Sequence, residues 1–143
     1  MKKKPNQISF DMETDEIEFN EQVLLVNKAF YTKKICKVAG SLRFPIPTEI
    51  TTDLNLSSSD LCYFIEYSEG YYIAFKIKPE DIPLKRQYRH RKLIKAGMYD
   101  TLFVAIPQFI KNKYTSEITY IQLIRPKGFK ENEWQIQFFT DSI

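Results

Sequence analysis

Apolar and polar residues alternate along much of this chain with the period of two that is typical of half-buried β-strands. The first clear set begins with a short strand at 34–38 and a turn at 39–41. Residues 42–47, L-R-F-P-I-P, are expected to be extended, because each proline biases the residue before it toward the extended region. A short helix with one apolar side is predicted over 48–56, and alternating strands around S-E-G predict a β-hairpin over 61–78.

The second half of the chain repeats this order. The stretch S-L-R-F-P-I-P-T-E-I at 41–50 corresponds to T-L-F-V-A-I-P-Q-F-I at 101–110, so that Pro47 aligns with Pro107. Around the second copy the pattern predicts a strand, a turn, an extended segment, a helix and two strands, at 91–95, 96–100, 101–107, 108–114, 117–126 and 134–139. An internal repeat of this kind indicates one structural unit that occurs twice, and it decides the fold.

The net charge of +3 hides a strong segregation of charge along the chain. Residues 10–27 contain six acids and no Lys or Arg, whereas 33–43 and 85–95 contain Lys and Arg and no acid. Each basic run lies just before one copy of the repeated motif, and such runs create local fields that a net charge does not reveal. The acidic run is expected to be solvated; the alternative is that it covers a basic face of its own or another molecule, in imitation of nucleic acid.

Length and hydropathy limit the number of domains and the kind of protein that this chain can be. At 143 residues and 17.0 kDa, the chain is expected to form one domain or two very small ones. Its apolar runs are far shorter than the ~20 residues that span a bilayer, and its basic start leads into no signal-like segment. We therefore expect a soluble, cytoplasmic protein that has no contact with a membrane.

The usual catalytic and metal-binding signatures are missing from the sequence. A single histidine, His90, and two cysteines, Cys36 and Cys62, supply no recognisable zinc set and no histidine-based triad. No glycine-rich phosphate loop occurs. We expect no enzyme activity, no metal and no cofactor. Both cysteines are expected to be small core residues, and His90 a surface group.

The first copy of the motif resembles the SpoVT/AbrB-like domain, a family that includes AbrB-type transition regulators and MazE-type antitoxins. The matching features are a turn, an Ile-Pro step, an acid-Ile pair, an L-x-L step, an acid and a hairpin: Gly40-Ser41, Ile46-Pro47, Glu49-Ile50, Leu54, Leu56, Asp60 and 61–78. Ser59 stands where the family usually has Gly. The second copy is degenerate: Phe109 replaces the acid and the L-x-L step is missing, but it keeps Gly97, Leu102, Ile106-Pro107 and Ile110.

This resemblance implies a mainly β fold, a swapped-hairpin AbrB-like β-barrel. Family members of this kind interleave two copies, and a half of about 45 residues is too small to bury an adequate core alone. With both copies in one chain, the barrel is expected as an intrachain pseudo-dimer of two β-β-short helix-β-β repeats. The expected boundaries are an N-terminal extension at 1–31 with one or two strands or a short helix, a first repeat at 32–79, a connector at 80–90 and a second repeat at 91–140.

The resemblance also implies a DNA-contacting face, built from the first strand and turn of each copy. The candidate residues are Lys33, Lys34, Lys37, Arg43, Arg89, Arg91, Lys92 and Lys95. Arg43 is the candidate for base recognition, because a guanidinium can bond O6 and N7 of guanine together. The second copy has Phe103 at that place, so the two half-sites are expected to differ. The tyrosines of the hairpins are interpreted as barrel wall rather than as a stacking platform for single strands.

The first hypothesis is therefore a sequence-selective protein that binds double-stranded DNA, a nucleoid-associated transcriptional repressor. The second is a MazE-type antitoxin, which binds DNA and would engage a toxin through residues 1–31. The third is an interaction module that has lost DNA binding. A monomeric pseudo-dimer and a homodimer are both compatible with the sequence.

Overall fold

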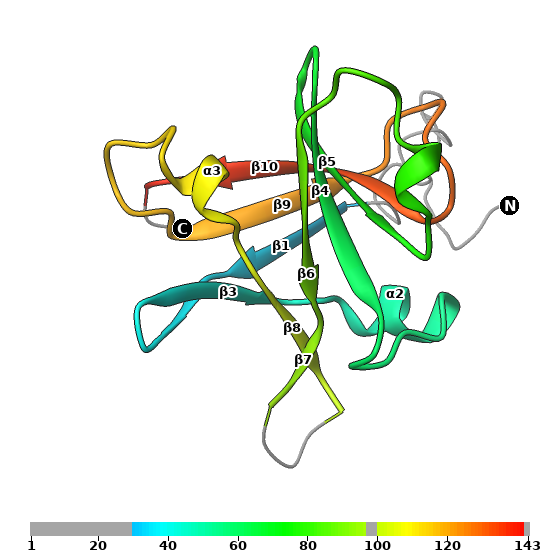
Figure 1. The fold of residues 1–143 in the computed structure, drawn as a ribbon. Helices are drawn as coiled ribbons and strands as arrows, with labels where there is room; N and C mark the ends of the chain where they lie inside the picture. The colour runs from blue at the N-terminus through cyan, green and yellow to red at the C-terminus, as the bar shows by residue number, and fades with distance from the viewer. Residues whose placement is uncertain (1–29, 97–99, 142–143) are drawn as a thin grey trace, which may run out of the picture. The chain divides into compact units, whose positions relative to one another are not determined.

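The computed structural model describes residues 30–96 and 100–141. The description below concerns the unit that begins at Tyr31, together with Phe30. This unit is mainly β, with its strands in two antiparallel sheets (Figure 1). The predicted N-terminal extension, apart from its last two residues, lies outside the described residues.

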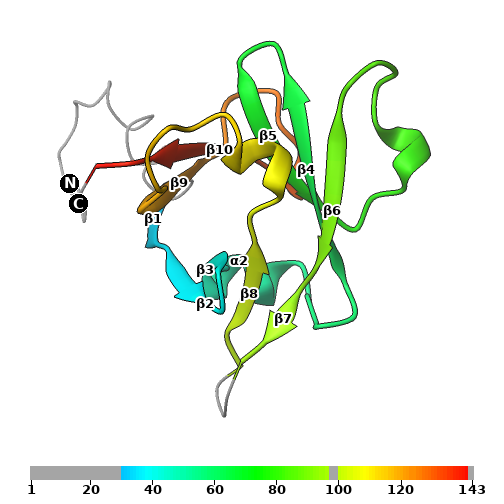
Figure 2. The same ribbon diagram turned by 60° about the vertical axis from the view of Figure 1, so that its left-hand side comes forward.

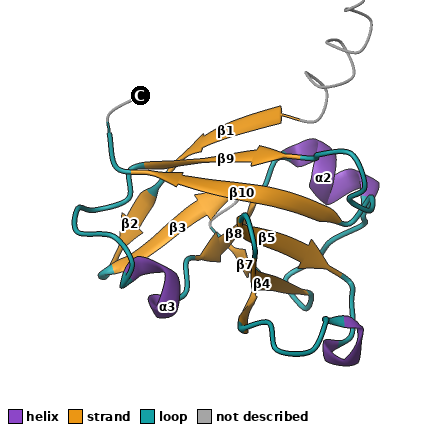
Figure 3. Cartoon of the chain, turned by 90° about the horizontal axis from the view of Figure 1, so that it is seen from above, coloured by secondary structure: helices purple, strands orange, loops and turns teal. Residues whose placement is uncertain are grey.

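The large sheet has the strand order β1-β9-β10-β5-β4-β6, and the small sheet has the order β2-β3-β8-β7. The strands are β1 (Phe30–Lys34), β2 (Cys36–Val38), β3 (Ser41–Pro45), β4 (Leu61–Tyr67), β5 (Gly70–Phe75), β6 (Tyr88–Lys92), β7 (Ile94–Lys95), β8 (Leu102–Ala105), β9 (Tyr120–Ile124) and β10 (Glu133–Phe139). The helices, shown in purple in Figure 3, are α2 (Thr48–Asp53), the 3-10 helix η1 (Pro79–Asp81) and α3 (Gln108–Lys111).

The main core lies between the two sheets. Alternate residues of β3 and β8 are buried, and Phe44 meets Phe64 of β4 edge to face with ring centroids 6.4 Å apart. Val104 lies opposite Phe44 in β8 and is also fully buried. These side chains point from the small sheet toward the large one. Their chain neighbours, among them Arg43 and Phe103, consequently lie on the outer face of the small sheet.

A local twofold relation connects the two repeats at the centre of the small sheet. Strands β3 and β8 pair antiparallel, with Phe44 opposite the residue that aligns with it in the second motif. Just beyond this pair, the amide of Ile46 donates to the carbonyl of Leu102 at 2.8 Å. Its mate in the other half is the amide of Ile106, which donates to the carbonyl of Leu42 at 2.9 Å. The motif that occurs twice in the sequence therefore pairs with itself in the structure.

The large sheet follows the same twofold relation. Strands β1, β4 and β5 of the first repeat correspond to β6, β9 and β10 of the second, and reversing the strand order exchanges one repeat for the other. The first strand of each repeat lies against the hairpin of the other, β1 beside β9 and β6 beside β4 (Figure 2). Equivalent backbone hydrogen bonds lie at the two junction residues, Ile35 between β1 and β2 and Leu93 between β6 and β7. The amide of Ile35 donates to the carbonyl of Thr119 at 3.0 Å, and that of Leu93 donates to Asp60 at 3.1 Å.

A second hydrophobic cluster covers the face of β4 and β5 that points away from the small sheet. Its buried members are Tyr63, Ile65, Tyr72, Ala74 and Ile82. The segment between β5 and β6 packs over this face, so that Ile82 is only 7% exposed. The connector between the repeats is therefore part of the core. The equivalent face of β9 and β10 is more polar, with Gln122, Gln135 and Gln137 beside Tyr120, Ile124 and Phe139.

The structure confirms the mainly β composition and the repeated order of strands and short helix. In the last strand, predicted at 134–139, alternate residues Trp134, Ile136 and Phe138 are buried. The closed barrel is wrong, because the strands form two separate sheets. The chain leaves the large sheet and enters the small one at single residues, Ile35 between β1 and β2 and Leu93 between β6 and β7.

Two local predictions also need correction. Cys62 is buried as predicted, but Cys36 is exposed, because all three residues of the edge strand β2 are exposed. Strand β6 begins at Tyr88, inside the segment predicted as a connector. The turn at Ala39-Gly40 is confirmed, with both residues at positive φ; its counterpart falls partly outside the described residues.

Candidate nucleic-acid interface

Six of the eight candidate residues form three pairs that the twofold relation makes equivalent. Lys37 lies opposite Leu42 and Lys95 opposite Leu102, and these two leucines are themselves equivalent. In β1 and β6 the equivalent positions are counted back from the junction residues Ile35 and Leu93. The resulting pairs are Lys33 with Arg91, Lys34 with Lys92, and Lys37 with Lys95.

The members of each pair have the same exposure to solvent. Lys33 and Arg91 are half-buried, whereas both members of the other two pairs are exposed. β1 and β2 carry one member of each pair along one side of the small sheet, and β6 and β7 carry the other along the opposite side (Figure 2). The structure thus arranges these cations as two matched rows about the local twofold axis.

Arg43 lies beside this axis, next to Phe44, on the outer face of the small sheet. It stands directly opposite Cys36 on one side and Ala105 on the other. Its Nε is buried and has no hydrogen-bond partner within the described part of the chain. At the equivalent position, Phe103 stands opposite Ile94 and Pro45. The outer face is therefore apolar around one guanidinium.

The structure does not gather all candidates on one face. Lys37 lies opposite buried Leu42 whereas Arg43 belongs to the alternate set of β3, so the two leave the small sheet on opposite faces. Lys37 is held by Glu117 at 2.9 Å, and its mate Lys95 lies 3.7 Å from Asp100. Such exposed ion pairs are weak, typically below about 1 kcal/mol, so a stronger anion can replace the carboxylate.

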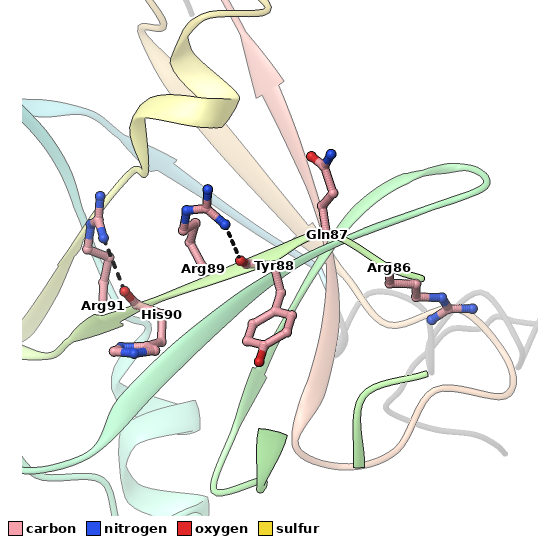
Figure 4. Close-up of a pocket in the computed structure, with 6 residues that line it drawn as sticks. All are labelled: Arg86, Gln87, Tyr88, Arg89, His90 and Arg91. Atoms are coloured by element: carbon pink, nitrogen blue, oxygen red, sulfur yellow. Dashed lines mark hydrogen bonds between the residues drawn. The ribbon is translucent and has the colours of Figure 1, made fainter. Parts of the chain in front are cut away.

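Two arginines of β6, the edge strand of the large sheet, bond to backbone carbonyls of the same strand. Arg89 donates to the carbonyl of Tyr88 at 2.8 Å, and Arg91 donates to the carbonyl of His90 at 3.1 Å (Figure 4). Figure 4 shows both guanidinium groups on one side of the strand and the rings of Tyr88 and His90 on the other. Arg89 also lies over the ring of Phe109 of α3, 5.5 Å from its centroid.

Hydrogen-bond register explains which groups this edge presents. The amide of Glu66 donates to the carbonyl of Gln87, and the amide of Leu93 donates to Asp60. In an antiparallel pair, this alternation turns the peptide groups of the even-numbered residues 88–92 outward. Two of those outward carbonyls accept the guanidinium bonds just described. The edge is therefore rich in positively charged donors, which suits an anion and also discourages pairing with another strand.

Arg86 is a site residue that the sequence analysis did not select. It lines the same hollow as residues 87–91 (Figure 4). It donates to the hydroxyl of Tyr72 at 3.1 Å and lies 5.9 Å from the ring centroid of Tyr67. The signal was present, since Arg86 belongs to the second basic run. Only the structure shows that Arg86 lies beside Tyr67 and Tyr72 of the first hairpin.

In residues 30–96 and 100–141, no group of three His, Cys, Asp or Glu side chains is placed to hold a metal ion. No helix of the described part is long and apolar enough to cross a membrane. Comparison with known proteins found no match: no protein-family model, curated protein or solved structure is significantly similar to this chain.

Proposed function

We propose that this chain is a SpoVT/AbrB-like protein that binds double-stranded DNA and regulates transcription. The observation that carries the proposal is the pairing of basic residues about the local twofold axis. Duplex DNA has two antiparallel phosphate backbones, so a protein with two matched cationic rows can contact both in the same way. The interleaved pairing of β1 with β9 and β6 with β4 supports the swapped-hairpin arrangement that the resemblance implies.

The roles of the residues follow from their chemistry. The exposed lysines Lys34 and Lys92 position the protein through phosphates, because a lysine is a flexible point charge. Arg43 is the base-reading residue, since it lies beside the local twofold axis on the outer face of the small sheet and a guanidinium recognises guanine through two bonds. Arg89 and Arg91 add phosphate contacts from the edge of the large sheet.

The test is a comparison of two charge-reversed proteins on DNA from upstream of the chain's own gene. The Lys34→Glu/Lys92→Glu double variant changes one exposed residue in each matched row. A matched control is Lys127→Glu/Lys130→Glu, which reverses two exposed lysines in the loop between β9 and β10. Binding should be lost in the first protein and kept in the second, with both folded by circular dichroism. Equal affinities of the double variant and the wild type would overturn the proposal.

A further inference from the structure

The local twofold relation gives each paired lysine a basic equivalent, but the central strands β3 and β8 of the small sheet carry different residues at equivalent positions. The row across β2, β3 and β8 is Cys36-Arg43-Ala105, and the equivalent row across β7, β8 and β3 is Ile94-Phe103-Pro45. One half therefore carries a guanidinium where the other carries an aromatic ring. The flanks differ as well, because Arg89 of β6 corresponds to Tyr31 of β1.

The central difference, Arg43 against Phe103, falls at the position to which the proposed function assigns base recognition. A guanidinium in the major groove bonds guanine, whereas an aromatic ring can contact only the methyl group of thymine there. The matched lysines, in contrast, contact phosphates that look the same in both directions along a duplex. Phosphate contacts thus permit two orientations of the protein on DNA, and the central residues distinguish between them.

We infer that the protein binds a non-palindromic DNA site in one fixed orientation, with the Arg43 half on a guanine-containing half-site and the Phe103 half on a thymine-containing one. This inference rests on the proposed DNA-binding function and specifies its substrate. A symmetric homodimer of one repeat would select a palindrome. This chain has two different halves in a fixed order, so its two possible orientations on a DNA duplex are not equivalent.

Cys36 provides a direct way to observe that direction. It is exposed and lies directly opposite Arg43, whereas Cys62 is fully buried. An iron chelate on Cys36 would cut DNA near the Arg43 half. In a Cys36→Ser/Ile94→Cys protein, the chelate would sit at the equivalent place beside Phe103. Duplexes selected from a randomised pool with the unlabelled full-length protein serve as the DNA.

The expected result is that each conjugate cuts on one side of the site and that the two conjugates cut on opposite sides. The exchange variant Arg43→Phe/Phe103→Arg should reverse this pattern, and Phe103→Arg alone should produce cuts on both sides. Symmetric cutting by both wild-type conjugates would overturn the inference while leaving DNA binding intact. Failure to select any duplex would instead contradict the proposed function.

A second measurement does not depend on the label. From the selected sequence, duplexes are built that combine its two half-sites as left-right, left-left and right-right. The unlabelled protein should bind left-right more tightly than either symmetric duplex. The difference should be on the order of tenfold for the duplex with two thymine half-sites, because it loses the guanidinium–guanine contact. It should be smaller for the duplex with two guanine half-sites, because that duplex loses only the contact of Phe103. Equal affinities for the three duplexes would contradict a fixed orientation.

Discussion

At the scale of single residues, two groups show how local contacts decide chemistry. Burial raises the pKa of the Cys62 thiol well above its ordinary value, so that Cys36 is the thiol available to reagents in the folded protein. Burial also raises the pKa of Asp60, but hydrogen bonds from Ser57 and Lys76 outweigh it and hold the pKa below its usual range. The Ser57 amide donates at 2.8 Å and the Lys76 ammonium at 3.2 Å.

Asp60 should therefore contribute to stability in a pH-dependent way. Its lowered pKa means that its contribution is complete above the unfolded pKa, near 3.9, and is lost as the pH falls through the folded pKa. Asp60→Asn should lower the free energy of unfolding by about 1 kcal/mol at neutral pH. The difference from the wild type should disappear in acid. Urea unfolding of both proteins, at neutral pH and at a pH below the folded pKa of Asp60, measures this difference in the free energy of unfolding.

The matched control is Glu80→Gln, which removes an equal charge from an exposed position. It should leave the free energy of unfolding within about 0.5 kcal/mol of the wild type. An Asp60→Asn protein as stable as the control at neutral pH would show that the bonds to Ser57 and Lys76 do not hold in solution.

At the scale of elements, the pairing of β3 with β8 is the contact on which the architecture depends. Phe44 is fully buried at its centre and meets Phe64 across the core. Phe44→Ala should lower the free energy of unfolding by about 3–5 kcal/mol, because it leaves a cavity between the sheets. Leu84→Ala changes a residue that is 92% exposed and should have almost no effect. Chemical denaturation that finds similar losses for both variants would contradict the assigned core.

The sequence predicts most elements of this fold because their patterns are local. The first hairpin is almost continuously apolar at 61–65, and it is buried on both faces. The last strand alternates, and only one of its faces is buried. The connector was harder to predict, since Ile82 becomes a core residue only once β4 and β5 offer it a surface.

For the candidate site, sequence alone found the basic residues but could not arrange them. The equivalence of Lys34 and Lys92 depends on where β1 and β6 leave the large sheet, and that is set by long-range hydrogen bonds. The opposite directions of Lys37 and Arg43 follow from the register of β2 on β3. A register one residue different would reverse every side chain of the strand.

At the scale of the whole molecule, the interleaving of strands makes the two repeats depend on each other. β1 has its partner strand in the second repeat, and β6 has its partner in the first. A chain divided between Pro83 and Lys85, in the exposed part of the connector, should give two fragments that are each unfolded. Mixing them should restore the β-sheet signal in circular dichroism. Cooperative thermal unfolding by either fragment alone would contradict the interleaved architecture.

The central claim is that two matched rows of cations contact the backbones of a DNA duplex. It is tested most directly by the dependence of DNA affinity on salt. If Lys34 and Lys92 each neutralise one phosphate, these two residues together should contribute about −1.8 to the log–log slope, at roughly −0.9 per contact. Lys34→Ala and Lys92→Ala should each reduce its magnitude by about 0.9, and by the same amount, because the residues are equivalent. Absence of DNA binding, or a slope that neither substitution changes, would contradict the account.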